Sequence, residues 1–416
     1  MFANGDMRRS PLCVVGHSRI LATMEEYDVI IVGGGIHGAG VLQAAVAAGH
    51  SALLVERRAL ASGTSSRSSK LIHGGLRYLE SGQFSLVRES LKERTIHLRI
   101  APDLVELKPF FIPVYRDTRR RPWMLKVGLA LYATLGGFGA ATRFGSVPKA
   151  EWAQLDGLET TGLDDVIRYY DAQTDDAQLT RAVVQSARVL GATVAMPCTF
   201  RDAELNDSGV HVRIEDGDAL RHCAARVLVN AAGPWAMQVA RAVRPAISIP
   251  DVDLVQGTHI ALPIPLTRGI YYVESPDDGR AVFIMPWRGG TLIGTTETPF
   301  HGEPDAVRPL PEEEEYLLAV ARRYFPAFAH LGRDAITERF AGLRVLPSAA
   351  QSAFDRSRET MYCTDREPKP RVLAIYGGKL TGWRAAAAEV LKRISPSLPG
   401  RPRRAATEDM PLRRAV

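Results

Sequence analysis

The stretch Tyr27-Asp-Val-Ile-Ile-Val32, followed at once by Gly33-Gly-Gly35-Ile-His-Gly38, decides the fold of this chain of 416 residues. The first run is short, apolar and β-branched, which is typical of a buried parallel strand. The second run matches G-x-G-x-x-G, and an Ala-rich helix to about Ala48 follows it. A second strand, Ala52–Val55, ends at Glu56. Together these segments form a βαβ unit and predict a Rossmann-like dinucleotide-binding domain.

Each glycine of this fingerprint has a predicted task. Gly33 makes the tight turn, Gly35 lets the backbone approach a pyrophosphate, and Gly38 packs the helix on the strand. The N–H groups and the dipole of the helix N-terminus stabilise the phosphate charge. Glu56 lies 18 residues past Gly38, where an acidic side chain binds ribose hydroxyls. Because that side chain disfavours a 2′-phosphate, the motif indicates FAD or NAD rather than NADP.

The composition is that of an ordinary globular protein, with 46% hydrophobic and 24% charged residues. At ~150 residues per domain, the length allows two to three domains. The net charge of +6 comes from 52 basic and 46 acidic residues, an excess too small and too dispersed to indicate nucleic-acid binding. The cysteines are scattered and predict no disulfide framework, no metal site and a cytoplasmic location. They are Cys13, Cys198, Cys223 and Cys363.

Three further segments indicate how the domain continues. Residues 61–79 are dense in hydroxyls and glycines, which suits an extended cofactor better than a continued nicotinamide-binding domain. Residues 226–235 and 372–381 each predict a buried strand that ends in small residues or a Gly-Gly turn, and a helix is predicted over Trp383–Ile394. The ends of these strands can meet at one sheet edge. The pattern therefore predicts a cofactor domain interrupted by insertions.

A set of motifs occurs in a consistent order over roughly residues 24 to 395. They are Ser68-Ser-Lys-Leu-Ile-His-Gly-Gly-Leu-Arg-Tyr-Leu79, Asn230-Ala-Ala-Gly-Pro-Trp235, Gly257-Thr-His-Ile260, Ile293-Gly-Thr-Thr296, Gly342-Leu-Arg344 and Gly377-Gly-Lys-Leu-Thr381. In this order they resemble the FAD-dependent glycerol-3-phosphate dehydrogenases. The resemblance implies FAD as cofactor and an α/β fold, with a glutathione-reductase-type FAD-binding Rossmann-like domain and an interleaved antiparallel-sheet substrate domain.

The resemblance also implies a division of the chain. The expected segments are an N-terminal extension at 1–23, outside the ordered fold; a discontinuous FAD-binding domain at 24–85, 165–245 and 335–395; a substrate or cap domain at 86–164 and 246–334; and a tail or truncated linker at 396–416. The family's usual C-terminal helical domain is expected to be missing.

The implied activity is oxidation of sn-glycerol 3-phosphate to dihydroxyacetone phosphate, with hydride transfer from C2 to FAD N5. In the family, the positions matching Arg77 and Arg344 hold the phosphate and hydroxyls, and those matching Tyr78, His259 and Lys379 line the same site. His259 is the first candidate for the base that removes the hydroxyl proton, and Arg344 would stabilise the alkoxide. His73 is the second candidate for the base. Lys379 could instead lie at the flavin O2 edge.

The expected cofactor-binding residues come from the fingerprint, the hydroxyl-rich loop and the two later strand ends. They are Gly33, Gly35, Ile36, His37, Gly38, Glu56, Arg57, Thr64, Ser65, Ser69, Lys70, Leu71, His73, Ala232, Gly233, Trp235, Gly377, Gly378, Lys379, Leu380 and Thr381.

Two other functions stay open at this point. One is an amine, amino-acid or other polyol-phosphate oxidase of the same superfamily, and the other is a non-catalytic flavin-binding relative. The electron acceptor is a quinone, oxygen or a carrier protein, between which the sequence does not choose.

A different kind of signal lies at 119–135, where an arginine-rich and aromatic flank leads into an apolar helix from about residue 123 to 135. A core helix is the favoured interpretation, and peripheral contact with the inner face of the membrane is the alternative. Two acidic runs receive structural interpretations: 312–315 complements the dipole of a helix N-terminus, and 171–176 is a solvated cap.

Overall fold

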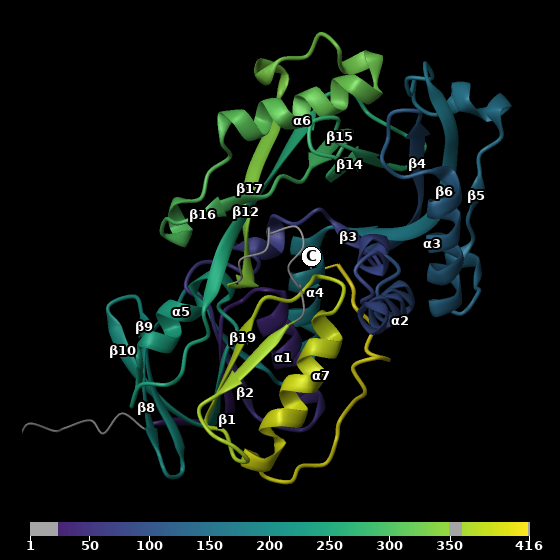
Figure 1. Ribbon diagram of the computed structural model, residues 1–416. Helices are drawn as coiled ribbons and strands as arrows, with labels where there is room; N and C mark the ends of the chain where they lie inside the picture. The colour runs from purple at the N-terminus through teal and green to yellow at the C-terminus, as the bar shows by residue number, and fades with distance from the viewer. Residues whose placement is uncertain (1–23, 349–359, 415–416) are drawn as a thin grey trace, which may run out of the picture.

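The computed structural model describes residues 24–348 and 360–414, so the predicted N-terminal extension at 1–23 lies outside the described residues. Within this part of the chain, two β-sheets of nine and ten strands organise the molecule. The two sheets occupy opposite ends of the molecule in Figure 1, with the glycine-rich segments between them.

The first sheet is the predicted nucleotide-binding sheet. Strand β10 pairs in parallel with both β1 and β19, and β1 also pairs in parallel with β2. The three predicted glycine-terminated strands therefore end at one edge of one sheet. The strands of this sheet are β1 (Glu25–Val32), β2 (Ala52–Val55), β7 (Thr193–Ala195), β8 (Thr199–Asn206), β9 (Gly209–Asp216), β10 (Ala219–Asn230), β11 (Val243–Arg244), β18 (Met361–Thr364) and β19 (Val372–Tyr376).

Both faces of the parallel strands are covered, which explains their unbroken apolar sequences. On one face, Val29 and Ile31 pack with α1 (Ile36–Ala47), α4 (Asp176–Val189) and α7 (Trp383–Ile394). On the other face, Ile30 and Val32 pack with residues of β8, β9 and β10, in which β9 pairs antiparallel with both β8 and β10. Figure 1 shows α1 and α7 side by side over this sheet. This layering confirms the predicted Rossmann-like α/β fold.

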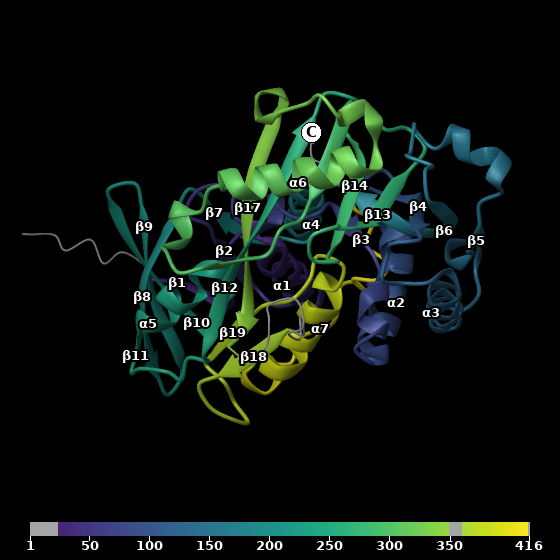
Figure 2. The ribbon, with the colours of Figure 1, turned by 45° about the horizontal axis from the view of Figure 1, so that its top comes forward.

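The second sheet is largely antiparallel, as the resemblance implies. Helix α6 (Pro311–Tyr324) lies across it (Figures 1 and 2) and buries Leu317 and Leu318 against Ile260 and Ile293. The strands are β3 (Leu71–Ile72), β4 (Val105–Tyr115), β5 (Gly145–Ser146), β6 (Leu163–Thr174), β12 (Val252–Leu262), β13 (Ile270–Glu274), β14 (Ala281–Trp287), β15 (Gly290–Gly294), β16 (Thr298–Phe300) and β17 (Glu338–Pro347).

Sheet membership differs from the expected segment boundaries in three places. Strands β3 and β17, and all but the first two residues of β6, lie within segments expected to belong to the FAD-binding domain, yet all three strands belong to the second sheet. Strand β6 pairs along its length with β4, and β17 pairs with β12 from Val252 to Ala261. The local sequences of these strands do not indicate to which sheet each belongs, because pairing with distant segments decides where a strand lies.

Helix α3 (Pro122–Leu135) corrects the favoured interpretation of the apolar segment. It follows α2 (Phe84–Ile100), and only one face of α3, including Leu125 and Leu129, is buried. Trp123 is 67% exposed and Val127 is 62% exposed. The helix is therefore not a core helix but has an apolar face open to the surroundings. No helix in the described ranges is both long and apolar enough to cross a membrane.

The segment expected to be a tail is folded onto the first domain. The backbone N–H groups of Arg404 and Ala405 donate to the carbonyl of Ala47, at distances of 2.8 and 3.1 Å. Leu412 is buried in the core beside α1, and its N–H donates to the carbonyl of Ile100. The described part of the expected tail or truncated linker at 396–416 is therefore packed against the rest of the fold. The remaining helix, α5 (Ala236–Arg241), follows β10.

Candidate active site

The predicted glycine fingerprint forms a tight cradle at the end of β1. A Cβ atom on Gly33, whose φ is +111°, would lie 2.6 Å from the carbonyl oxygen of Ala231, and one on Gly38 would lie 1.9 Å from that of Gly33. Both positions therefore require glycine. By contrast, a Cβ on Gly35 would meet only Ser65 Oγ within 4 Å, at 3.1 Å. The backbone at Gly35 is thus open to the space where a pyrophosphate is expected.

Glu56 and the hydroxyl-rich loop surround this cradle. The Glu56 carboxylate accepts hydrogen bonds from the N–H groups of Gly34 (2.7 Å) and Arg58 (2.8 Å). Ser65 Oγ accepts one from the N–H of Ile36, the first residue of α1, at 2.9 Å. These bonds hold an acidic group at the end of β2 and a hydroxyl at the helix N-terminus, where a dinucleotide needs them.

A single cavity of about 520 Å³ connects this cradle with the second sheet. Among the predicted site residues, all but Gly38 and Lys70 line it. Those that line it are Gly33, Gly35, Ile36, His37, Glu56, Arg57, Thr64, Ser65, Ser69, Leu71, His73, Arg77, Tyr78, Ala232, Gly233, Trp235, His259, Arg344, Gly377, Gly378, Lys379, Leu380 and Thr381.

Three basic side chains from distant parts of the sequence meet in this cavity. Arg77 lies near the end of the hydroxyl-rich loop, Arg344 lies on β17, and Lys379 follows the Gly-Gly turn after β19. Two of them lie over the Tyr78 ring, with Lys379 Nζ 3.7 Å and Arg77 Cζ 5.2 Å from its centroid. Arg344 donates from Nη1 to Glu297 Oε1 (2.8 Å) and from Nη2 to Thr295 Oγ1 (2.9 Å).

His259 enters the same cavity from β12. Its ring stacks on Phe340, with the ring centroids 5.0 Å apart, and its Nε2 lies 3.0 Å from Ser69 Oγ. The side chain is buried. Burial, followed by the charges of Lys70 and Arg344, holds the pKa of His259 well below its usual value. The imidazole is therefore neutral at physiological pH and has a lone pair available.

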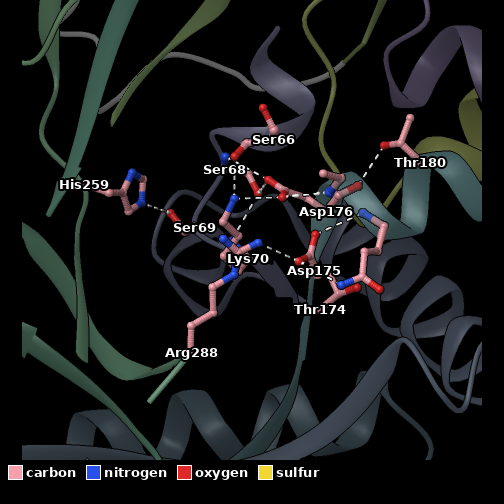
Figure 3. Close-up of polar contacts among 12 residues, drawn as sticks. Ser66, Ser68, Ser69, Lys70, Thr174, Asp175, Asp176, Thr180, His259 and Arg288 are labelled. Atoms are coloured by element: carbon pink, nitrogen blue, oxygen red, sulfur yellow. Dashed lines mark hydrogen bonds and ion pairs between the residues drawn. The ribbon is translucent and has the colours of Figure 1, made fainter. Parts of the chain in front are cut away.

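Lys70 is the predicted cofactor residue whose side chain lies elsewhere. Its Nζ is 2.8 Å from Asp176 Oδ1 and also donates to the carbonyl of Ser66, and both side chains of the ion pair are almost fully buried. Figure 3 shows this pair on one side of the loop and the contact between Ser69 and His259 on the other side. Lys70 therefore fixes the loop instead of reaching into the cavity.

The acidic run at 171–176 is not the solvated cap that we predicted. Asp171 is buried in an ion pair with the buried Arg94, and the hydroxyl of Tyr132 donates to it at 2.6 Å. Asp176 is buried against Lys70. Asp175 alone behaves as a cap, accepting a hydrogen bond from the N–H of Gln178 at 3.0 Å. These carboxylates are paired because a buried charge without a partner is very costly.

The Gly-Gly turn after β19 is braced from two sides. A Cβ on Gly378, whose φ is +90°, would lie 2.4 Å from Nε2 of His37, so the half-buried His37 ring packs directly on this turn. Thr381 Oγ1 accepts the N–H of His73 at 3.0 Å, and the carbonyl of Thr381 lies 2.9 Å from Nε2 of His97. His97, on α2, was not predicted, because nothing in its local sequence distinguishes it from a surface histidine.

Several residues that line the cavity were not predicted from the sequence, among them Arg67, Arg201 and Arg280. Arg67 lies inside the hydroxyl-rich loop, where its basic charge among phosphate-binding groups was an available signal. Arg201 and Arg280 lie on segments that reach the cavity only through the arrangement of the sheets.

The chain is similar to known proteins over most of its length. Residues 28–388 match the family described as FAD dependent oxidoreductase. The aerobic glycerol-3-phosphate dehydrogenase of Escherichia coli is 36% identical over 390 residues, which cover 91% of this chain and 75% of that protein. The chain belongs to the glycerol-3-phosphate dehydrogenase group of FAD-dependent oxidoreductases.

Two other comparisons add detail to this family assignment. The D-erythritol 1-phosphate dehydrogenase of Brucella abortus is 34% identical over 394 residues, covering 91% of this chain and 76% of that protein. The crystal structure of the glycerol-3-phosphate dehydrogenase from Bacillus halodurans in complex with FAD superposes with a TM-score of 0.71 at 26% identity, covering 93% of this chain and 68% of that one. Both the fold and the cofactor of the family agree with the resemblance seen in the motifs.

Proposed function

We propose that this protein oxidises the C2 alcohol of sn-glycerol 3-phosphate to the ketone of dihydroxyacetone phosphate. The proposal rests on one observation: the glycine cradle and the side chains of Arg77, Arg344 and Lys379 line the same cavity. The cradle suits a dinucleotide, and the basic groups suit a small phosphorylated substrate beside it.

FAD fits the residues present. The open backbone at Gly35, the N-terminus of α1 and the carboxylate of Glu56 would hold its pyrophosphate and ribose. The braced turn at 377–381 and the loop around His73 would hold its ring system. When bound, FAD accepts the hydride that leaves the substrate carbon.

The substrate phosphate requires charge and fixed donor geometry. A guanidinium binds phosphate in a bidentate manner, which a single ammonium does not. Arg77 and Arg344 supply such groups, and the contacts of Arg344 with Glu297 and Thr295 hold its guanidinium in one orientation. Arg344 would also stabilise negative charge on the C2 oxygen during oxidation.

Removing the hydroxyl proton requires a base. His259 is neutral and lines the cavity, and its Nε2 lies 3.0 Å from Ser69 Oγ. In our proposal the proton of the C2 hydroxyl passes toward Nε2 of His259 as the hydride leaves C2. His73 also lines the cavity and is the second candidate for this role.

An anaerobic half-reaction tests this proposal. Oxidised, FAD-loaded protein is mixed with sn-glycerol 3-phosphate, and the flavin absorption is followed. Loss of the oxidised flavin band with formation of dihydroxyacetone phosphate supports the proposal. A bound flavin that remains oxidised at millimolar substrate contradicts it.

A second substrate follows from the relative in Brucella abortus, which is named for D-erythritol 1-phosphate. It shares with glycerol 3-phosphate a secondary alcohol and a phosphate. Comparing the flavin reduction rates with the two compounds, and with glycine as an amino-acid control, decides between the substrate classes. The basic groups around Tyr78 favour a phosphorylated polyol over an amino acid.

We also propose that the exposed face of α3 contacts a membrane surface. Trp123, Val127 and Leu131 follow one another at helical spacing on this face, and all are exposed. Arg119 and Arg121 are exposed beside the helix start, whereas Arg120 is paired with Glu80 and Glu274. Exposed basic and aromatic flanks of this kind suit an anionic lipid interface.

Sedimentation with vesicles tests this surface. Vesicles containing phosphatidylglycerol should carry the protein down, and the double variant Trp123→Glu with Val127→Glu should stay in the supernatant. Leu220→Glu, at an exposed leucine on β10, is the matched control and should still bind. Equal sedimentation of all three proteins would contradict the proposal.

A further inference from the structure

Glu313 is a buried carboxylate that the proposed mechanism does not use. It lies in the first turn of α6, and only 5% of its surface is exposed. One oxygen, Oε2, accepts hydrogen bonds from Gln256 Nε2 (2.6 Å), Thr258 Oγ1 (2.6 Å) and the N–H of Leu310 (3.2 Å). Our prediction for this acidic run explained only the last of these contacts, at the helix N-terminus.

The other oxygen, Oε1, contacts the chain between two strands. It accepts hydrogen bonds from Thr296 Oγ1 (2.8 Å) and Thr298 Oγ1 (2.6 Å). A carboxylate offers about four lone-pair positions, so these contacts use its full accepting capacity. Glu313 therefore joins β12 to residues 295–298, and each of its contacts with these two segments comes from a side-chain donor.

The connection that Glu313 holds is irregular. His259 of β12 faces Gly294 of β15, and Gln256 faces Thr298 of β16. Between these pairs, the two residues 257–258 of β12 face the three residues 295–297. Such an extra residue makes a bulge, which turns side chains away from the regular alternation of a sheet.

Two residues of this bulge hold Arg344. Thr295 Oγ1 accepts from Arg344 Nη2 at 2.9 Å, and Glu297 Oε1 accepts from Nη1 at 2.8 Å. Glu313 binds the threonines on both sides of Glu297, and Thr258, which it also binds, directly precedes His259. One carboxylate thus fixes the supports of both the proposed phosphate ligand and the proposed base.

We propose that Glu313 is a positioning residue for oxidation of the phosphorylated polyol. This inference rests on the proposed function, since Arg344 and His259 act in it. Glu313 touches neither cavity nor substrate; it acts by holding the bulge at 295–297 so that Glu297 and Thr295 orient the Arg344 guanidinium. Misplacing a reacting or binding group by about 1 Å can cost about 100-fold in rate.

The ionisation of Glu313 supports this geometry. Burial opposes its charge, but the hydrogen bonds from Thr258, Thr298 and Thr296 outweigh that effect and keep the pKa of Glu313 below its usual value. The group is therefore a charged acceptor throughout the physiological pH range, so every hydroxyl around it donates toward it.

The test compares Glu313→Ala and Glu313→Gln with Glu314→Gln. Glu314 is the matched control because it is the next residue on α6, is equally buried, and pairs with Arg333 and Arg339 instead of the bulge. In FAD-loaded protein we expect Glu313→Ala to slow flavin reduction at saturating glycerol 3-phosphate by about 10- to 100-fold. Glu313→Gln keeps an acceptor oxygen and should recover most of the rate, while Glu314→Gln should match the wild type.

A second readout does not depend on turnover. Binding of dihydroxyacetone phosphate, followed by perturbation of the flavin spectrum, should weaken in Glu313→Ala while the FAD content stays unchanged. If Glu313→Ala does not fold, Thr296→Val removes one link without altering α6, and it should also slow flavin reduction, by about tenfold or more. A wild-type rate and affinity in Glu313→Ala, or in Thr296→Val where that variant replaces it, would overturn the proposal.

Failure of the proposed function has a different signature. If wild-type protein is not reduced by glycerol 3-phosphate, the substrate assignment fails. The positioning claim is then decided by a crystal structure of Glu313→Ala: loss of the contacts between Arg344 and Glu297 supports it, and an unchanged Arg344 overturns it.

Discussion

Ser69 Oγ lies 3.0 Å from Nε2 of His259, and both residues line the same cavity. The other ring nitrogen, Nδ1, is buried without a hydrogen-bond partner among the described residues. Nε2 is therefore the ring nitrogen at which we propose that His259 takes up the proton, and the Ser69 hydroxyl is its hydrogen-bond partner there. This relationship defines how the proposed base would work.

The first prediction concerns His259 itself. Replacing it by Ala removes the proposed proton acceptor, and loss of an acid–base group costs about 100-fold or more. Anaerobic stopped-flow reduction of the flavin by glycerol 3-phosphate measures this rate. An unchanged rate in a variant that still binds FAD would exclude His259 and leave His73 as the candidate.

The second prediction concerns the pH dependence of the same rate. Because burial, Lys70 and Arg344 keep the pKa of His259 well below 6.5, the base stays deprotonated as the pH falls through that value. The rate of flavin reduction should thus show no acid limb near pH 6.5. A loss of rate centred there, absent from the His259→Ala variant, would mean that the imidazole titrates normally.

The third prediction separates Ser69 from the other hydroxyls of its loop. Ser69→Ala should slow flavin reduction, since the hydrogen-bond partner that orients Nε2 of the proposed base is lost. Ser66→Ala is the control: its hydroxyl donates to the carbonyl of Gly63 at 3.3 Å and does not line the cavity. Equal rates in the two variants would show that Ser69 has no part in the transfer.

The fourth prediction concerns stability at low pH. Burial lowers the pKa of His97 to about 4, so the folded state favours the neutral ring. Its contribution is complete above pH 6.5 and is lost as the pH falls toward 4; a shift of this size corresponds to about 3 kcal/mol. The free energy of unfolding of His97→Gln should therefore fall less steeply over this range. A slope equal to that of the surface control His211→Gln would contradict the prediction.

The fifth prediction concerns the buried pair of Lys70 and Asp176. Lys70→Met leaves the Asp176 carboxylate buried without its cation, which costs about 3–5 kcal/mol of folding free energy. Adding Asp176→Asn removes that charge and should restore part of the loss. Denaturant unfolding of both single variants and the double variant measures the coupling; additive losses would show that the two groups do not interact.

The local sequence was sufficient to predict the helix and the turns that build the nucleotide site. The helix predicted at Trp383–Ile394 occurs with those bounds, and the glycine fingerprint lies where the βαβ pattern put it. These signals are local, since a turn that requires glycine and a helix that starts after it are encoded within a few residues of each other.

What local sequence did not predict depends on partners far along the chain. Lys70 and Asp176 are 106 positions apart, and Glu313 and Thr258 are 55 apart. Each acidic run alone is typical of exposed surface, because charged side chains are seldom buried without a partner. The partners become visible only when the second sheet brings them together.

The measurement that tests the central claim most directly is a titration of the oxidised, FAD-loaded protein with sn-glycerol 3-phosphate in the absence of oxygen. We predict full loss of the oxidised flavin band, with one dihydroxyacetone phosphate formed per flavin reduced, and a strong loss of this reaction in Arg344→Met. A flavin that stays oxidised in the wild-type protein at saturating substrate would contradict the account.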